Sequence, residues 1–283
     1  MQLQLRPITQ LLRVGLLAAM MAVAALPADR AEGGPNLADT VLPLRDAFQG
    51  MTGDELFARL LEHNRLRDAH LHQYSAVRSY EVKDSEGRLR AQETVVLQYM
   101  APETKSFKTT SEKGSWIIRN LVFKRLMESE VEASAGQQHR DSSIKPVNYT
   151  FTLIGEQDVG PYRCLVVDAV PKRRDKYLFE GRVWIDAEDF GVVRIAGQPA
   201  KKLSFWITRV NFVRQYQRIG EFWLPSKDET FVDVKLYGKK VFAIDHRDYA
   251  INGSDASDEQ TEEGVAALRH QGQDASPVPL TRE

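Results

Sequence analysis

Hydrophobic and polar residues alternate along most of the middle of the chain, which is the pattern of half-buried β-strands. The alternation begins at residues 72–82, where Tyr74, Ala76, Tyr80 and Val82 fall on one face. A period of two places successive side chains on opposite faces of a strand. The same pattern predicts further strands at 93–100, 105–110, 115–118, 149–155, 162–170, 181–186, 191–197, 203–217, 221–236 and 239–250.

The turns between these segments carry glycine, as tight hairpins require. Gly87, Gly160, Gly220 and Gly238 each lie between two predicted strands. Several of the strands exceed the usual length of ~5–6 residues. Long, consecutive, twisted strands favour a curled sheet. The sequence therefore predicts an α+β fold in which a long antiparallel meander of about eleven strands curls into a half barrel.

One helix is predicted before the meander. Thr52 and Glu55 match a capping box, in which the N-cap hydroxyl and the acid three positions later satisfy free backbone N–H groups. Apolar residues recur at helical spacing from Leu56 onward. These signals predict a helix over residues 54–66.

A second helix is predicted inside the meander, at residues 120–131, where the hydrophobic period changes from two to 3.6. We expect both helices to cover the apolar concave face, the second as a lid. One face of the second helix is apolar: Val122, Phe123, Leu126, Met127 and Val131.

The N-terminus has the layout of a secretory signal peptide, over residues 1–28. Arg6 and Arg13 precede an apolar run at 14–26. This run is shorter than the ~20 residues that span a bilayer. Cleavage after Ala28 is expected, and an uncleaved anchor stays open as the alternative.

The rest of the chain divides into three parts by composition. Residues 29–50 contain two prolines and are interpreted as a linker with one helical turn. Residues 51–252 are long enough for one domain with a substantial core. Residues 253–283 combine many acids, Gln, Ser and Pro with no aromatic residue, and are expected to form a disordered acidic tail.

Net charge and cysteine content bear on the partners and the cellular compartment of the protein. The formal net charge is −1, so no strong field recruits nucleic acid. Cys164 is the single cysteine and has no partner for an internal disulfide. Export without disulfides favours a bacterial periplasm. Cys164 lies in a buried-strand pattern and is expected to be a core thiol.

Three acids, Asp186, Glu188 and Asp189, stand close together between two runs of strand residues. Asp at the start of this segment and Gly191 at its end are typical of a turn, where Asp bonds its own backbone and Gly supplies a positive φ. We expect a solvent-exposed hairpin turn. A metal site or a catalytic carboxylate is the alternative, although nothing in the local pattern supplies the burial that tunes a carboxyl pKa.

Other polar groups offer weaker candidates. His63, His70 and His72 would form a zinc site if they converged on one point, but they fall on a helix and a strand. The basic segment 172–176 is interpreted as a solvated hairpin tip, with contact to anionic lipid headgroups or to a carboxylate on a partner as its functional alternative. No acid–base or nucleophile set is recognisable, so we do not expect an enzyme.

Two motifs resemble a known superfamily. The segments VWID at 183–186 and VVR at 192–194 resemble the tryptophan–aspartate hairpin of the lipoprotein-carrier superfamily, which includes LolA, LolB and the sensor domain of RseB and MucB. GEFWLP at 220–225 resembles a step in outer-membrane lipoprotein-sorting proteins. The resemblance runs from about residue 52 to 250. The charged segment 172–176 and the acidic tail depart from LolA itself.

The resemblance implies an eleven-stranded half barrel whose apolar concave face is closed by helices and binds acyl chains. It implies a non-enzymatic periplasmic carrier without a cofactor, possible partners being an acylated lipoprotein or lipid, an inner-membrane transporter and an outer-membrane acceptor. The alternative is an envelope sensor of the RseB and MucB type.

Alternation along the strands indicates which side chains line such a cavity. We expect it to be mainly apolar with few fixed polar groups, so that affinity rises with acyl chain length and depends little on headgroup or salt. The candidate cavity and lid residues are Tyr80, Leu97, Tyr99, Trp116, Val122, Phe123, Leu126, Met127, Val166, Trp184, Trp206 and Phe212.

Overall fold

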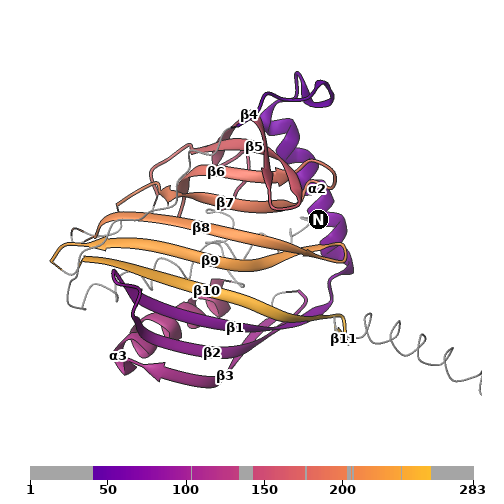
Figure 1. The fold of residues 1–283 in the computed structure, drawn as a ribbon. Helices are drawn as coiled ribbons and strands as arrows, with labels where there is room; N and C mark the ends of the chain where they lie inside the picture. Colours follow the sequence, from indigo (N-terminus) through magenta and orange to yellow (C-terminus); the bar gives the residue numbers. More distant parts are fainter. Residues whose placement is uncertain are drawn as a thin grey trace, which may run out of the picture.

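The computed structural model describes residues 41–102, 104–133, 143–175, 177–202, 205, 207–236 and 238–255. Ten long strands form one antiparallel sheet (Figure 1). The strands are β1 (Gln73–Asp84), β2 (Leu89–Met100), β3 (Thr104–Gly114), β4 (Tyr149–Val159), β5 (Tyr162–Pro171), β6 (Phe179–Asp186), β7 (Val192–Pro199), β8 (Ile207–Ile219), β9 (Phe222–Val234) and β10 (Gly238–Ile251).

The strand order confirms the half barrel but is not a simple meander. It runs β3-β2-β1-β10-β9-β8-β7-β6-β5-β4, so the last long strand returns to pair with the first. The chain crosses from edge strand β3 to the opposite edge strand β4 between residues 114 and 149, and within the described residues these edges stay unpaired with each other. A two-residue strand, β11 (Ser254–Asp255), extends the sheet beside β10.

The prediction of a strand at 115–118 is wrong. The chain turns at Gly114, and Ser115 caps a helix by accepting a hydrogen bond from the backbone N–H of Ile118 at 3.4 Å. Four residues are too few to distinguish a period of two from a period of 3.6. The resulting helix consists of α3 (Trp116–Ile118), the π-helical turn η4 (Arg119–Phe123) and α4 (Lys124–Ala133), and is called the lid helix below.

The first helix, α2 (Gly53–His70), confirms the predicted capping box between Thr52 and Glu55. It continues one turn beyond the predicted end at 66. Arg67 donates to the backbone oxygen of Asp189, and His70 lies 3.1 Å from a carboxylate oxygen of Glu221. Polar tertiary contacts hold this last turn, so the hydrophobic pattern of the sequence does not predict it.

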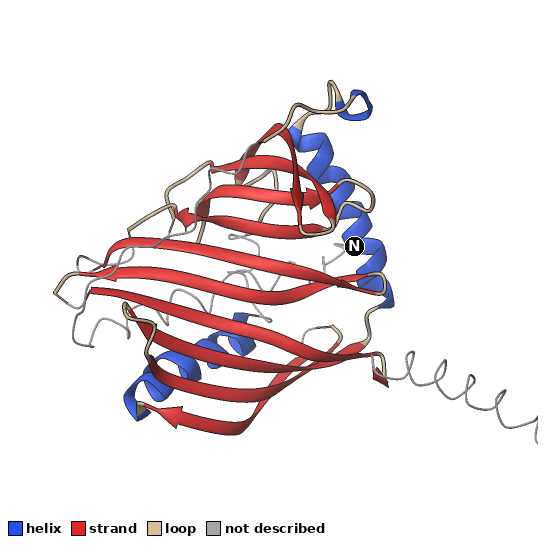
Figure 2. Ribbon diagram, viewed as in Figure 1, coloured by secondary structure: helices blue, strands red, loops and turns tan. Residues whose placement is uncertain are grey.

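Both helices cover the same face of the sheet, called the inner face (Figure 2). Phe123 of the lid helix packs on Tyr80, and Phe57 of α2 stacks on Phe151. Directly opposed residues share a face, and their pairing defines the inner face from β1 to β4: Tyr80, Ile244, Asp228, Arg214, Ile195, Val183, Val167 and Leu153.

The described part of the predicted linker is attached to the sheet. Leu42 exchanges backbone hydrogen bonds with Glu156 on β4. A short 3₁₀ turn, η3 (Asp46–Phe48), follows. The signal peptide 1–28 and most of the predicted tail lie outside the described residues, so the domain boundaries stay predictions. Among the described helices, not one is both long enough and apolar enough to cross a membrane.

Candidate functional site: the inner face beneath the lid helix

The half of the inner face under α2 is an apolar core. The rings of Phe57 and Phe151 are stacked with centroids 3.5 Å apart and planes 7° apart. Leu56 and Leu60 are buried in the same cluster, together with side chains from β4 to β9. A Cβ at Gly53 would overlap the backbone of Phe151, so the start of α2 lies directly against β4. This packing leaves α2 little freedom to move.

The lid helix covers the other half. Its buried residues pack on Tyr80 and Val82 of β1, Ala91 and Val95 of β2, and Phe242 and Ile244 of β10. The sequence predicted this contact for Val122, Phe123, Leu126 and Met127, but Val131, assigned to the same face, is 42% exposed. The buried face of the lid helix consists of Ile118, Val122, Phe123, Leu126 and Met127.

A third apolar cluster lies beyond the lid helix, near the end of α2. It contains Leu97 and Tyr99 of β2, and the Tyr74 ring stacks on that of Tyr99 with centroids 5.1 Å apart. The hydroxyl of Tyr249 donates to the backbone oxygen of Pro225 at 2.8 Å. The inner face therefore has apolar surface on both sides of its centre.

Most of the candidate cavity and lid residues are buried where the alternation places them. Their role in lipid binding stays a prediction, because burial alone does not identify a ligand. The residues on the inner face or on the covering side of the lid helix are Tyr80, Leu97, Tyr99, Val122, Phe123, Leu126, Met127 and Phe212.

Two candidates lie on the opposite face, called the outer face. Trp184 pairs with Val166 and with Arg194, and Arg194 pairs with Gln215. Gln215 is three positions from Phe212, and an odd separation in one strand means opposite faces. Trp184 is nevertheless buried, and its Nε1 donates to Gln157 at 2.8 Å. Burial on both faces hid the alternation, so the sequence assigned both residues to the wrong face.

The two remaining candidates are also tryptophans. Trp116 is the first residue of the lid helix rather than part of a strand, and it is 68% exposed. The expectation that it lines the cavity is therefore wrong. Trp206 lies outside the described residues.

The expectation of few fixed polar groups is wrong as well. Arg78 on β1 and Lys105 on β3 are buried among the apolar clusters, and Glu130 of the lid helix lies between them. Arg78 Nη1 donates to Glu130 Oε2 at 2.7 Å, and Lys105 Nζ lies 3.9 Å from Glu130 Oε1. The signal for Arg78 was present, since it interrupts an otherwise apolar face between Ala76 and Tyr80.

The pKa values of this group follow from burial and neighbouring charge. Burial alone would raise the pKa of Glu130, but the charges of Arg78 and Lys105 outweigh it and hold the pKa below its ordinary value. Burial lowers the pKa of Lys105, and the Glu130 charge offsets only part of that effect. Burial raises the pKa of Tyr74 to about 12, so its hydroxyl stays neutral. The lid helix thus carries an ionised carboxylate into a buried cationic site.

A second buried polar group lies on β8, β9 and β10. Asp228 lies 3.5 Å from Arg214 and 3.2 Å from His246 Nε2. Burial would raise the pKa of Asp228, but Arg214 and His246 hold it low. Burial, followed by the charge of Arg78, lowers the pKa of His246, which is therefore neutral near pH 7. The two carboxylate oxygens of Asp228 thus face Arg214 and His246, one each.

The acidic turn is a hairpin between adjacent antiparallel strands, as predicted, but it is not fully exposed. Asp186 is 4% exposed and accepts hydrogen bonds from the backbone N–H groups of Glu188 and Asp189. Burial raises its pKa. The Asp189 carboxylate accepts a hydrogen bond from Nε1 of Trp223 at 3.0 Å and lies 3.4 Å from Arg67. These bonds keep its pKa low despite burial. Asp189 thus anchors the turn to α2 and β9, whereas Asp186 bonds within the turn.

Gly191 serves this turn differently from what was expected. The residue with a left-handed backbone is Phe190, at φ 58°. Gly191 is needed for space, because a Cβ there would overlap the indole of Trp223. Packing of the Phe190 ring near His63 and under the guanidinium of Arg59 holds the turn against α2.

The other candidates occupy separate places. His63 contacts Phe190, His70 contacts Glu221, and His72 is exposed at the start of β1. Within the described ranges, no three His, Cys, Asp or Glu residues are grouped as a metal site requires. Cys164 is buried, which confirms the core thiol, and burial raises its pKa to about 12. In the basic segment, Lys172 donates to the backbone oxygen of Pro146 at 2.6 Å.

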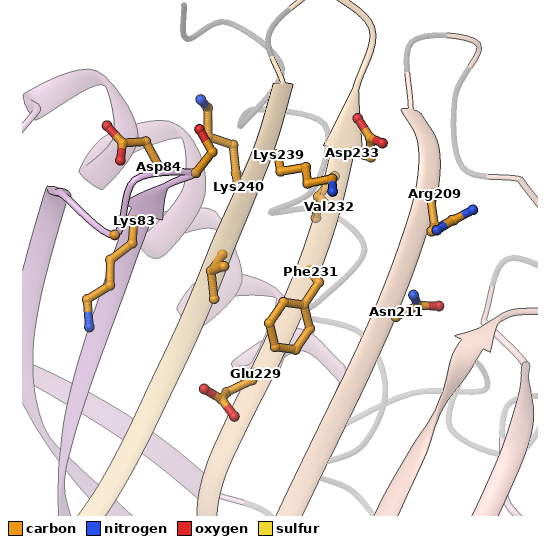
Figure 3. Close-up of a pocket in the computed structure, with 13 residues that line it drawn as sticks. Lys83, Asp84, Arg209, Asn211, Glu229, Phe231, Val232, Asp233, Lys239 and Lys240 are labelled. Carbon is orange, nitrogen blue, oxygen red and sulfur yellow. The ribbon is translucent and has the colours of Figure 1, made fainter. Parts of the chain in front are cut away.

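The outer face carries an open pocket of about 360 Å³ over β1, β10, β9 and β8 (Figure 3). Phe231 lies in the middle of the labelled side chains, with Glu229 and Asp233 on the same strand and Lys83 and Arg209 to either side. Charges of both signs surround one aromatic ring. This arrangement differs from the covered, mainly apolar inner face.

No protein-family model matches the chain, and no curated protein matches it. The chain is similar to solved structures of a DUF1329 family protein from Desulfovibrio piger (9% identity, 71% of this chain and 93% of that chain, TM-score 0.37). It is similar to a putative outer membrane lipoprotein-sorting protein domain from Vibrio parahaemolyticus (12%, 74% and 99%, 0.36) and to a LolA superfamily protein from Nitrosomonas europaea (7%, 72% and 94%, 0.33). At these identities and TM-scores the likeness shows neither the family nor the function of this chain.

Proposed function

We propose that the protein is a non-enzymatic carrier for acylated ligands, which it holds on the inner face beneath the lid helix. The observation that carries this proposal is the contact of the lid helix with β1, β2 and β10. An acyl chain offers the same kind of apolar surface as the buried side of the lid helix. It could replace that side if the helix moved away.

The energetics suit such an exchange. Burial of each methylene contributes ~0.8 kcal/mol, so one long chain supplies several kcal/mol without any polar contact. A π-helical turn interrupts the lid helix at 119–123, and such turns are frequent at functional sites. Release would follow when the lid helix returns to the surface that the chain occupied.

We also propose that the chain is exported to the periplasm, with residues 1–28 as its leader. Its ligand would be a lipid or an acylated lipoprotein. An inner-membrane transporter and an outer-membrane acceptor would be the partners that load and unload it. Loading and unloading of such a ligand require no cofactor and no covalent chemistry.

Displacement of an environment-sensitive hydrophobic dye by alkanols of increasing length tests this proposal. Affinity should rise about fourfold per methylene, the equivalent of ~0.8 kcal/mol, until the chain fills the site. A flat response would mean that the inner face is a permanently filled core and would exclude the carrier.

Two phenylalanines on neighbouring strands locate the site. Phe242 faces the lid helix, with its ring centroid 5.9 Å from that of Phe123, whereas Phe231 lies in the outer pocket. Phe242→Ala should shift the preferred alkanol to a longer chain because it enlarges the inner site. Phe231→Ala should leave the preference unchanged. The reverse result would place the ligand on the outer face.

The outer pocket favours a second candidate, a sensor that binds another protein. Charged groups of both signs around one aromatic ring are typical of a protein contact rather than of an acyl site. A photo-crosslinking amino acid in place of Phe231 should then capture a protein in cells, and one in place of Phe242 should capture lipid if the carrier proposal holds.

A further inference from the structure

Beneath the lid helix, two buried cations of the sheet face one carboxylate of the helix. Arg78 is 1% exposed and Lys105 is 6% exposed, and both face Glu130, whose side chain is 15% exposed. A buried charge is costly unless its partners satisfy it. A single helix carboxylate therefore compensates the charge of two buried cations of the sheet.

Arg78 is also incompletely bonded. Nη1 donates to Glu130 and lies 3.4 Å from the hydroxyl of Tyr80. Among the residues that the structure describes, its Nε and Nη2 have no hydrogen-bond acceptor. A guanidinium presents its donors as a planar fork that matches the two oxygens of a carboxylate or phosphate. Among the described residues, the Nε and Nη2 side of this fork is therefore unused.

The neighbouring polar group does not supply the missing acceptor. Asp228 is held by Arg214 and by Nε2–H of His246, at 3.5 and 3.2 Å. With its proton on Nε2, the neutral His246 ring has only a lone pair on Nδ1, so His246 offers no further donor to an anion. The donors for an additional anion are therefore those of Arg78 and Lys105.

We propose that Arg78 and Lys105 bind the single anionic group, a carboxylate or a phosphate, of an amphiphile whose chain lies on the inner face. Glu130 of the lid helix occupies this site when no ligand is present. The inference rests on the proposed carrier function and specifies its ligand class as anionic amphiphiles.

The position of the two cations supports this class. Arg78 pairs across the strands with Val95, under the lid helix, while Lys105 pairs with Tyr99 of the third apolar cluster. A ligand whose anion replaces Glu130 would have apolar surface on both sides for its chain. The same replacement removes the ion pair that ties the lid helix to β1, so binding of the anion and opening of the lid are coupled.

Three ligands with one chain length test the proposal: dodecanoate, dodecyl phosphate and dodecanol. Both anions should displace the dye at concentrations about tenfold or more below that of the alcohol, because hydrogen bonds to charged groups are the stronger kind. Acetate and inorganic phosphate are the controls that carry the anionic group without the alkyl chain. If either displaces the dye as well as its amphiphile does, the site is one for free anions and the proposal fails.

Variants assign the preference to the named residues. Arg78→Met should abolish the preference for the anions and leave dodecanol binding in place, and Arg78→Lys should retain part of it. Arg247→Met, on the same strand pair but 62% exposed, is the matched control and should change nothing. Glu130→Gln removes the competing carboxylate at constant shape and should tighten anion binding severalfold without tightening dodecanol binding.

The outcomes separate this inference from the carrier function. Equal affinity for dodecanoate and dodecanol, with alkanol affinity still rising with chain length, would overturn the anionic site and leave the carrier. Absence of any chain-length dependence would overturn the carrier itself. Because Glu130→Gln and Arg78→Lys change few atoms, they keep the test valid if Arg78→Met does not fold.

Discussion

The two helices cover one continuous sheet face but are bound to it by different chemistry. Helix α2 is held by a capping box, by ring stacking of Phe57 on Phe151, and by Arg67 at its far end. The lid helix is held by an apolar stripe of side chains and by the Arg78–Glu130 ion pair, and it contains a π-helical turn. The first arrangement is that of a core, whereas the second is the one that the proposed ligand would replace.

This difference indicates where the molecule can open. Local opening has its own free energy, which for a mobile element lies below that of global unfolding. On the carrier proposal, an acyl chain and an anion would replace the contacts of the lid helix but not those of α2. The α2 half would then support the fold, and the lid half would support exchange.

The largest expected effect compares one phenylalanine in each half. Phe57→Ala should lower the free energy of unfolding by ~3–5 kcal/mol, as buried Phe truncations do. Phe123→Ala should lower it less. The loss cannot exceed the free energy of opening the lid helix alone, because a protein with an open lid keeps the rest of its fold. Chemical denaturation followed by near-UV circular dichroism measures both. An equal or larger loss for Phe123→Ala would make the lid helix part of the permanent core.

Leu126→Asp tests whether the lid helix opens alone. Burial of the unpaired charge should weaken lid closure by about 3 kcal/mol. Amide hydrogen exchange should then accelerate over residues 116–133 and stay slow in β5 and β6. Val131→Asp, at a position 42% exposed on the same helix, is the control. Acceleration throughout the sheet would show that the two halves unfold as one unit.

Gly191→Ala tests the anchor of α2. The added Cβ overlaps the indole of Trp223, and overpacking of this kind costs about 1–3 kcal/mol. The midpoint of denaturation should fall, and lid exchange should not change. Gly160→Ala has open space around it and should cost no more than about 1 kcal/mol for its left-handed backbone at φ 57°. Faster exchange in the lid helix would mean that the halves are coupled.

Acid is expected to loosen the lid helix selectively. The pKa of Glu130 in the folded protein is below its unfolded value of ~4.3. Its stabilising contribution is therefore complete above that value and is lost as pH falls through the folded pKa. Fluorescence of Trp116 at the start of the lid helix should report this change at acid pH. The pKa of Asp228 is also held low, so the difference between the wild-type protein and Glu130→Gln isolates the contribution of Glu130. Identical pH curves would exclude a role for the ion pair.

The smallest effect is expected from Trp116→Ala. This side chain is 68% exposed, so its removal should change stability by less than about 0.5 kcal/mol and leave alkanol displacement unchanged. A loss of binding would restore Trp116 as part of the ligand site.

The alternation of residues was sufficient for most of the sheet because most of its strands meet solvent on one side. Tyr80 and Phe212 were assigned to the inner face for this reason. The rule failed at Val166 and Trp184, which are buried on the outer face, because a strand covered on both sides shows no alternation. It also failed at 115–118, where the segment was shorter than either period needs.

The sequence by itself determined the α+β class, the capped first helix, the apolar face of the lid helix and most of the strands. These features depend on local capping, turn residues and hydrophobic period. Only the tertiary structure decided that β10 returns to β1 and that Arg78, Lys105 and Glu130 meet under the lid helix. It also decided that Asp189 anchors α2 through Arg67. Such contacts join residues far apart in the chain, and their geometry depends on how the sheet curls, which no local pattern encodes.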